Sequence, residues 1–265
     1  LGSLKYEDVC LLSNYFNQEL AKYSDPQEHQ KKLQDFILEL MPGLGGAAFH
    51  GTILLGWILQ DTKTDNLLLA EGLGYMTSFC EPFTDLKQFP NRSNGTRSLS
   101  EILISVQQEK KFADAFNPNW QTTYPIFQQR YSRLRNDYVP VLLEYLFQWK
   151  ISDIESAIEE LIFCATKAFV VSGANDFFLL HGITSCLAAV EITNCFPRTE
   201  EFYEDTVLFL QYYALGLMVA FVCQGSPDLL VKLPEHEVQS WDEIMHAVTR
   251  EDSKFNDAHL LKLVW

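Results

Sequence analysis

The chain has 265 residues, of which 47% are hydrophobic, and its formal net charge is −15 at pH 7. This length and apolar content suit one large globular domain, or two small ones, with an ample core. A surface this acidic repels phosphate backbones and anionic lipid headgroups, so nucleic acid and membrane surfaces are excluded as expected partners.

Helical periodicity dominates the first third of the chain. Apolar side chains at spacings of three and four predict a helix over residues 6–22. Asp25, followed by Pro26, has the pattern of a helix start and predicts a second helix that runs to about Leu40. The prolines and glycines that come next break this helix. Further helices are expected from Ala47 past Trp57 and over residues 65–79.

The middle of the chain begins with a loop and then shows repeated helix-start signals. Residues 81–97 are rich in proline and polar residues, which is typical of a loop. A serine three residues before a glutamate predicts a capping box at the start of a helix. Such pairs are Ser98 with Glu101, Ser152 with Glu155, and Ser240 with Glu243.

Three more helices are predicted from apolar runs in the last third. Asn175 or Asp176 is placed to cap the helix "FFLLHGITSCLAAVEI", and Asn256 or Asp257 to cap the last helix. The run 207–222 is apolar apart from Gln211 and is shorter than the roughly 20 residues that span a bilayer, so we interpret it as a buried core helix. The sequence therefore predicts an all-α, bundle-like fold of about ten helices, with residues 1–265 forming a single domain.

The six cysteines predict free thiols rather than a disulfide framework. No pair has the spacing C-x-x-C, and most of them lie in apolar segments. This pattern is typical of a reducing compartment and predicts a cytoplasmic protein. The glycosylation sequons at Asn91 and Asn94 argue weakly for secretion instead.

The stretch "GLGGAA", residues 43–48, matches the pattern G-x-G-x-x-A of a dinucleotide-binding turn. The preceding "LQDFILELM" is helical in pattern, whereas a dinucleotide turn follows a β-strand within a βαβ unit. We therefore favour a tight connection between two helices, in which small residues allow close packing.

Three histidines have apolar surroundings on three separate predicted helices: His50, His181 and His259. A lone histidine of this kind is usually a core residue with its hydrogen bonds satisfied. Histidines that face inward from several helices of one bundle are instead a common way to build a metal site. Imidazole suits iron, zinc, copper and nickel. His29 and His236 lie in charged stretches and are expected at the surface.

Lys262 lies three residues after His259, so the two side chains share one helical face. In one interpretation its stem packs on apolar neighbours and its ammonium group reaches water. In the other, the apolar neighbours favour a neutral amine that reacts with carbon dioxide. The resulting carbamylated Lys262 would be an anionic oxygen ligand beside His259.

Three segments that carry these histidines resemble the questin oxidase-like family: "AAFHGTILLGW", "FFLLHGITSCLAAVEI" and "DAHLLKLVW". The family includes fungal enzymes that oxidise and open anthraquinone rings, long grouped with NADPH-dependent Baeyer–Villiger oxygenases. At least one member is similar to a non-haem iron dioxygenase with four histidines and a carbamylated lysine as ligands. The resemblance implies that His50, His181, His259 and Lys262 are metal ligands. Leu54 departs from the pattern, because fungal members often have a second histidine there; His246 is the only other candidate.

The leading expectation is a non-haem iron oxygenase that uses Fe(II) and O₂ on a small aromatic, polyketide-like substrate. Three histidines and one oxygen donor would leave two open positions on an octahedral ion. The sequence does not identify the catalytic side chains of such an oxygenase. Trp57, Tyr75 and Phe178 would either line an aromatic substrate slot or belong to the core. One alternative is an NADPH-dependent Baeyer–Villiger-type monooxygenase, for which only "GLGGAA" offers a nucleotide site. Another is a non-catalytic helical protein with a degenerate metal site, which Leu54 favours.

Overall fold

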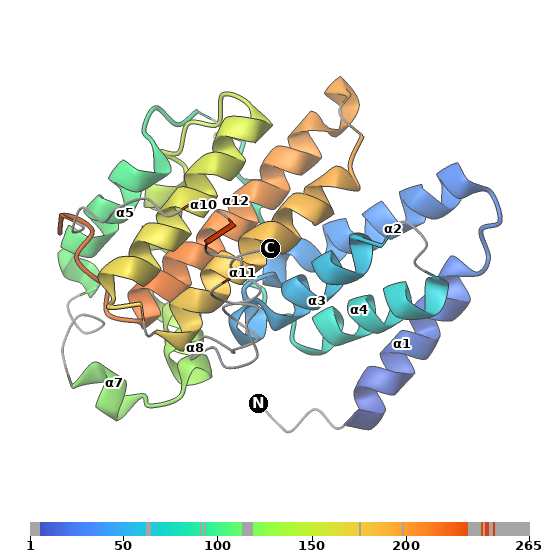
Figure 1. Cartoon of the computed structure of the whole chain (residues 1–265), viewed down its shortest axis with the longest axis horizontal. Helices are drawn as coiled ribbons and strands as arrows, with labels where there is room; N and C mark the ends of the chain where they lie inside the picture. Colours follow the sequence, from blue (N-terminus) through green and yellow to red (C-terminus); the bar gives the residue numbers. More distant parts are fainter. Residues whose placement is uncertain are drawn as a thin grey trace.

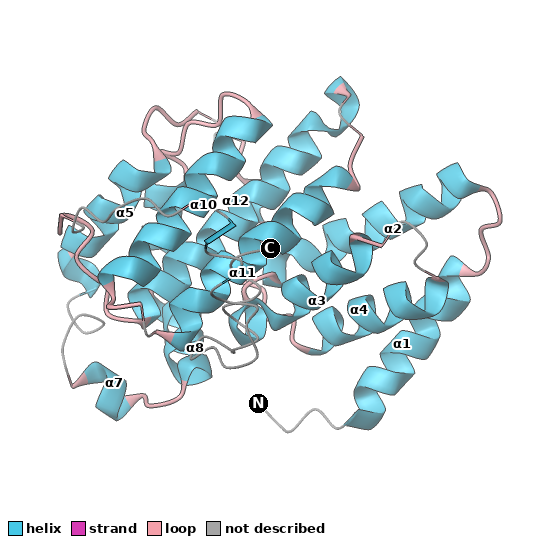
Figure 2. Cartoon of the chain, viewed as in Figure 1, coloured by secondary structure: helices cyan, strands magenta, loops and turns pink. Residues whose placement is uncertain are grey.

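The computed structural model describes residues 6–61, 65–90, 92, 94–112, 119–174, 176–197, 199–232, 240, 242–243 and 246. These residues form an all-α fold of about ten helices joined by loops, which confirms the predicted fold class (Figure 2). The only β-type pairing found within them is an isolated bridge between Arg97 and Trp149. The helices are α1 (Tyr6–Leu20), α2 (Pro26–Leu40), α3 (His50–Leu59), α4 (Asn66–Ser78), α5 (Leu99–Gln108), α7 (Trp120–Thr123), α8 (Phe127–Asp137), α9 (Val139–Leu146), α10 (Ile154–Val171), α11 (Phe177–Asn194) and α12 (Glu200–Cys223).

Helix α11 lies in the middle of the molecule and joins its two sides (Figure 1). On one side it packs against α3, which packs against α4, and α4 packs against α1. On the other side it packs against α10 and α12, and α12 also contacts α5, α8 and α9. The central position of α11 means that one of its faces meets α3 and other faces meet α10 and α12.

Two helices, α11 and α12, are long and apolar enough to cross a membrane by length and composition alone. In the structure 56% of the tested window of α11 and 100% of that of α12 are buried by other parts of the chain, which is the pattern of core helices. The predicted buried helix over residues 207–222 is therefore confirmed as the centre of the core.

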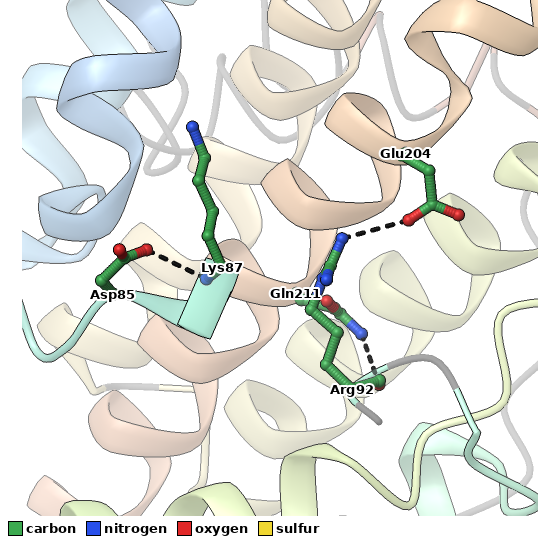
Figure 3. A network of polar contacts seen from close by, with 5 residues as sticks. All are labelled: Asp85, Lys87, Arg92, Glu204 and Gln211. Atoms are coloured by element: carbon green, nitrogen blue, oxygen red, sulfur yellow. Dashed lines mark hydrogen bonds and ion pairs between the residues drawn. The ribbon is translucent and has the colours of Figure 1, made fainter. Parts of the chain in front are cut away.

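Polar side chains within α12 bind the loop that precedes α5. Gln211 is fully buried, and its Nε2 donates to the carbonyl oxygen of Arg92 at 2.8 Å (Figure 3). The guanidinium of Arg92 in turn pairs with Glu204 at 3.1 Å. The hydroxyl of Tyr212 accepts the backbone N–H of Leu86 at 2.7 Å. Because a buried amide is costly unless it is hydrogen-bonded, the bond to the loop offsets part of the cost of burying Gln211 in the core.

Most of the predicted helix caps are confirmed. Asp25 caps α2, Ser98 and Glu101 form a capping box on α5, and Asp176 caps α11. Ser240 and Glu243 also exchange the hydrogen bonds of a capping box.

The predicted capping box of Ser152 and Glu155 is wrong. The N-cap of α10 is the next residue, Asp153, whose carboxylate accepts the backbone N–H of Ser156 at 2.8 Å. A carboxylate is the stronger acceptor, because its hydrogen bond to an N–H is charge-assisted and because it complements the helix dipole.

The sequence predicts that helix α3 starts at Ala47, but in the structure α3 begins at His50. Ala47, Ala48 and Phe49 have φ values of 45°, 55° and 65°, in the left-handed region. A left-handed residue with a side chain costs about 1–2 kcal/mol, so this turn is strained. It places Phe49 in the core with no exposed surface, 5.5 Å from the ring of Tyr213. Burial of a phenylalanine contributes about 1.5–3 kcal/mol and offsets part of the strain.

The stretch "GLGGAA" is the tight connection between α2 and α3, as expected from its helical context. It forms two short 3₁₀ turns, Met41–Gly43 and Gly46–Phe49. A Cβ atom at Gly46 would overlap the Phe79 carbonyl oxygen, at a distance of only 1.9 Å. Close packing against this backbone therefore explains the glycine without a nucleotide.

All six cysteines are free thiols, as predicted; Cys164, Cys186 and Cys223 are buried, and Cys10 is exposed. The single-domain organisation of residues 1–265 and the cytoplasmic location stay predictions.

Candidate metal centre

The first two predicted ligands come from two helices that pack closely side by side. His50 is the first residue of α3, and His181 lies one turn into α11. Further along, a Cβ atom on Gly56 would lie only 2.3 Å from Cα of Ala188. Because His50 contacts His181 at one end and Gly56 contacts Ala188 further along, the two helices run in the same direction.

The imidazole rings of His50 and His181 are in direct contact. Their centroids lie 4.5 Å apart, with an angle of 38° between the ring planes. Two imidazoles that bind one ion at about 2.1 Å, at roughly a right angle, have centroids about 4.6 Å apart. The separation of the two rings thus matches that of neighbouring ligands on one octahedral ion.

Both histidines are fixed in the same tautomer by a backbone carbonyl. Nδ1 of His50 lies 2.5 Å from the carbonyl oxygen of Ala47, and Nδ1 of His181 lies 2.6 Å from that of Phe177. A carbonyl oxygen only accepts hydrogen bonds, so in each neutral ring Nδ1 carries the proton. The lone pair then belongs to Nε2, and a hydrogen bond of this kind on the other nitrogen is what orients most metal-binding histidines.

The pair lies at the edge of the core. His181 is 3% exposed, whereas His50 is half-buried. The ring of Phe177 packs on His181 with centroids 4.3 Å apart and is itself 49% exposed. Phe177 therefore covers His181 on the side that faces water.

The remaining predicted ligands are not placed beside this pair by the structure. His259 and Lys262, with its predicted carbamate, lie outside the described residues. Leu54, which stands where fungal members often have a histidine, is one turn after His50 and 37% exposed. His246 is exposed. Within the described ranges no group of three or more His, Cys, Asp or Glu side chains gathers as a metal site.

His29 differs from its predicted place at the surface. Its ring is half-buried, and Nε2 lies 2.7 Å from the side-chain oxygen of Asn66. The neighbouring charged residues predicted a surface position, but the His29 side of α2 meets Asn66, the first residue of α4, and this contact covers part of the ring.

The three aromatic residues considered for a substrate slot have different surroundings. Phe178 stacks on Phe127 with centroids 4.3 Å apart and an angle of 11°, and Tyr75 packs on Phe79 at 4.7 Å. Trp57 is 38% exposed. Phe178 and Tyr75 thus contribute to packing between or within helices, and the slot stays a prediction.

A large apolar groove lies along α10, and neither His50 nor His181 lines it. Its volume is about 790 Å³. It is lined by Glu159, Ile162, Phe163, Thr166, Lys167, Val170, Leu229, Leu230, Val231 and Lys232. Because the described part of this lining contains no histidine and no cysteine, metal chemistry is better supported, among the described residues, at the histidine pair than in the groove.

Sequence reasoning found the two histidines but missed the groups that orient them. Phe177 precedes His181 by four residues, so the helical repeat was a signal that its carbonyl faces the histidine ring. No signal pointed to Ala47, because its carbonyl reaches His50 only through the left-handed turn. The Asp176 side chain was expected only as a helix cap.

The comparison with protein families gives a match over most of the chain. No curated protein matches the chain. The match is to the Questin oxidase-like family and extends over residues 11–265, a range that contains all four predicted metal ligands. The chain therefore belongs to the Questin oxidase-like family.

Proposed function

We propose that the protein is a metal-dependent oxygenase that acts on a small aromatic, polyketide-like substrate with O₂. Membership of the Questin oxidase-like family suggests an oxygenase that acts on aromatic polyketides. The metal dependence is carried by one observation: two histidine rings in contact, each with Nδ1 hydrogen-bonded to a carbonyl. Burial in the core accounts for one such hydrogen bond on each histidine, but it does not account for the contact between the two rings.

The donor set fits iron best when the whole family pattern is considered. In this proposal His50 and His181 hold the ion together with His259 and a carbamylated Lys262, a mixed nitrogen and oxygen set that suits Fe(II). Bound Fe(II) supplies one-electron chemistry with O₂, which amino-acid side chains lack. The carbonyls of Ala47 and Phe177 keep the two rings in the ligating tautomer, and the Phe177 ring limits the access of water to His181.

Anaerobic reconstitution tests the proposal. Metal-depleted protein is titrated with Fe(II), its iron content is measured, and O₂ uptake is followed after addition of a hydroxyanthraquinone. We expect about one iron per chain and O₂ uptake that requires both iron and the aromatic compound. His181→Gln should lose both, whereas His29→Gln, at a histidine that pairs with Asn66 on α4, should keep both.

Two other functions give different results in the same experiment. O₂ uptake that requires NADPH and is indifferent to iron would identify a Baeyer–Villiger-type monooxygenase. The absence of both iron binding and O₂ uptake would identify a non-catalytic helical protein with a degenerate site. If the parent protein binds no iron, that result contradicts the proposed function, even though the chain belongs to the family.

A further inference from the structure

Helix α11, which carries His181, begins at a network of polar side chains. One carboxylate oxygen of Asp176 accepts the backbone N–H groups of Phe178 and Leu179, each at 2.9 Å. The other oxygen accepts a hydrogen bond from Nε2 of Gln224, the C-cap residue that follows α12, at 2.5 Å. Both oxygens of the carboxylate are thus held, and the start of α11 is joined to the end of α12.

The network continues to a buried arginine on α8. Nη2 of Arg130 donates to the side-chain oxygen of Gln224 at 2.7 Å, and Nη1 donates to the carbonyl oxygens of Tyr124 and Pro125 at 2.8 and 3.1 Å. Arg130 is 4% exposed, and burial lowers its pKa, because the charged guanidinium loses its hydration. Gln224 therefore bridges a buried cation and an anion, which is more than a helix cap requires.

The link from Asp176 to His181 passes through one peptide group. The N–H of Phe178 and the C=O of Phe177 belong to the same planar amide. Asp176 accepts a hydrogen bond from the N–H of this amide. The C=O of the same amide, which belongs to Phe177, accepts Nδ1–H of His181 at 2.6 Å. A carboxylate on the N–H side of an amide fixes its plane and strengthens its carbonyl as an acceptor, because successive hydrogen bonds polarise one another.

We propose that Asp176, held by Gln224 and Arg130, is a positioning residue that acts on His181 through the peptide between Phe177 and Phe178. It keeps Nδ1 of His181 protonated, and so keeps the lone pair on Nε2 for a metal ion. This arrangement resembles the carboxylate partners of metal-bound histidines, with one amide inserted between carboxylate and imidazole. The inference rests on the proposed function only in taking His181 as a metal ligand.

The chain offers a matched control for the capping role. Helix α10 has the same length as α11, 18 residues, and is also capped by an aspartate, Asp153. The carboxylate of Asp153 accepts the backbone N–H of Ser156, and this amide belongs to the Glu155–Ser156 peptide, far from either histidine in sequence. Loss of either cap shortens or frays one helix, but only Asp176 lies on the path to His181.

Two measurements on the full chain test the inference. The first is the ¹⁵N spectrum of the histidine side chains in metal-depleted protein, with His181 assigned by comparison with His181→Gln. It reports which ring nitrogen carries the proton without any metal. The second is a calorimetric titration with Co²⁺. Both are made on the parent protein, on Asp176→Ala, on Asp176→Asn and on Asp153→Ala.

We expect Asp176→Ala to shift His181 away from the Nδ1–H form and to weaken Co²⁺ binding about 10- to 100-fold, as is typical of lost outer-sphere partners. Asp153→Ala should lose less thermal stability than Asp176→Ala, which also leaves Nε2 of Gln224 without its acceptor, and it should keep the parent spectrum and the parent affinity within about twofold. Asp176→Asn keeps the N-cap oxygen but turns an amide NH2 donor towards Nε2 of Gln224, so it should lose part of the thermal stability and show an intermediate loss of affinity.

Two outcomes would overturn the inference. One is an Asp176→Ala protein with the parent spectrum of His181; the other is an equal change in Asp153→Ala. Parent protein that binds no Co²⁺ contradicts the proposed function instead, and the ¹⁵N spectra then still decide whether Asp176 controls the tautomer of His181.

Discussion

Gly56 of α3 lies directly against Ala188 of α11, so closely that a Cβ atom on Gly56 would be 2.3 Å from Cα of Ala188 and 2.8 Å from its carbonyl oxygen. No backbone atom of Ala188 can move away without moving α11. The contact therefore sets the distance between the two helices, and through it the distance between His50 and His181.

We expect Gly56→Ala to destabilise the protein by about 1–3 kcal/mol, the usual cost of an overpacked core, and to weaken metal binding as the histidines separate. Urea unfolding and Co²⁺ titration measure the two effects. Gly182→Ala is the control, since its Cβ would lie 3.2 Å from a flexible Leu217 methyl group. It should stay within about 1 kcal/mol of the parent, because alanine also has the higher helix propensity. Equal effects of the two substitutions would show that helix spacing is not the cause.

The two histidines should act as a unit in metal binding. His50→Gln and His181→Gln should each weaken Fe(II) binding by more than about 100-fold, beyond the range typical of outer-sphere partners. The double variant should lose less than the sum of the two single losses, because either single variant already breaks the chelate that the pair forms. Parent affinity in either single variant, measured by anaerobic titration, would mean that the two rings do not share an ion.

Lys262 gives a separate test of the predicted carbamate. Lys262→Met should lose iron binding and keep the fold, because the apolar stem is replaced by one of similar size. Lys262→Glu should keep partial iron binding, because it retains an anionic oxygen on a shorter arm. Iron content after reconstitution measures both. If Lys262→Met binds iron as well as the parent, the side chain only extends to water and is not a ligand.

The start of α10 distinguishes the sequence-based cap from the observed one. Asp153→Ala should destabilise the protein by about 1 kcal/mol, because the N–H of Ser156 loses its acceptor. Ser152→Ala should change the free energy of unfolding by less than about 0.5 kcal/mol, as at an ordinary surface position. Thermal or urea unfolding measures both, and the reverse order would restore Ser152 as the cap.

The buried cysteines predict a pH dependence of reactivity and of stability. Burial raises the pKa of Cys164 and of Cys186 to about 12, because the thiolate loses its hydration. A disulfide reagent at pH 8 should modify the exposed Cys10 first and the buried thiols only after unfolding.

The sign for stability follows from the same shift. A thiol whose folded pKa is raised stabilises the folded state fully below its unfolded pKa of about 8.5, and this contribution is lost as the pH rises towards the folded value. Urea unfolding should therefore show a falling stability between pH 8.5 and the folded pKa, and Cys186→Ala should reduce the slope. An unchanged slope in Cys186→Ala would contradict the assignment of this effect to the thiol.

The sequence by itself determined the fold class, the position of most helices and the identity of the family. Apolar residues at helical spacing, the prolines and the capping residues are local signals, and local hydrogen bonds satisfy them in any helical fold. This is why Asp25, Ser98 and Asp176 were found as caps from the sequence. At the start of α10 two adjacent residues, Ser152 and Asp153, can each accept the N-cap hydrogen bond, and the capping-box pattern predicted Ser152 instead of Asp153.

Only the tertiary structure decided how the histidines are arranged. The contact between His50 and His181 depends on the direction and spacing of α3 and α11, which Gly56 and Ala188 set by close packing of their backbones. The left-handed turn before His50 is also a tertiary effect, because burial of Phe49 offsets part of a strain that the local sequence disfavours. The path from Arg130 through Gln224 to Asp176 joins three helices, and no local pattern encodes contacts between residues so distant in the chain.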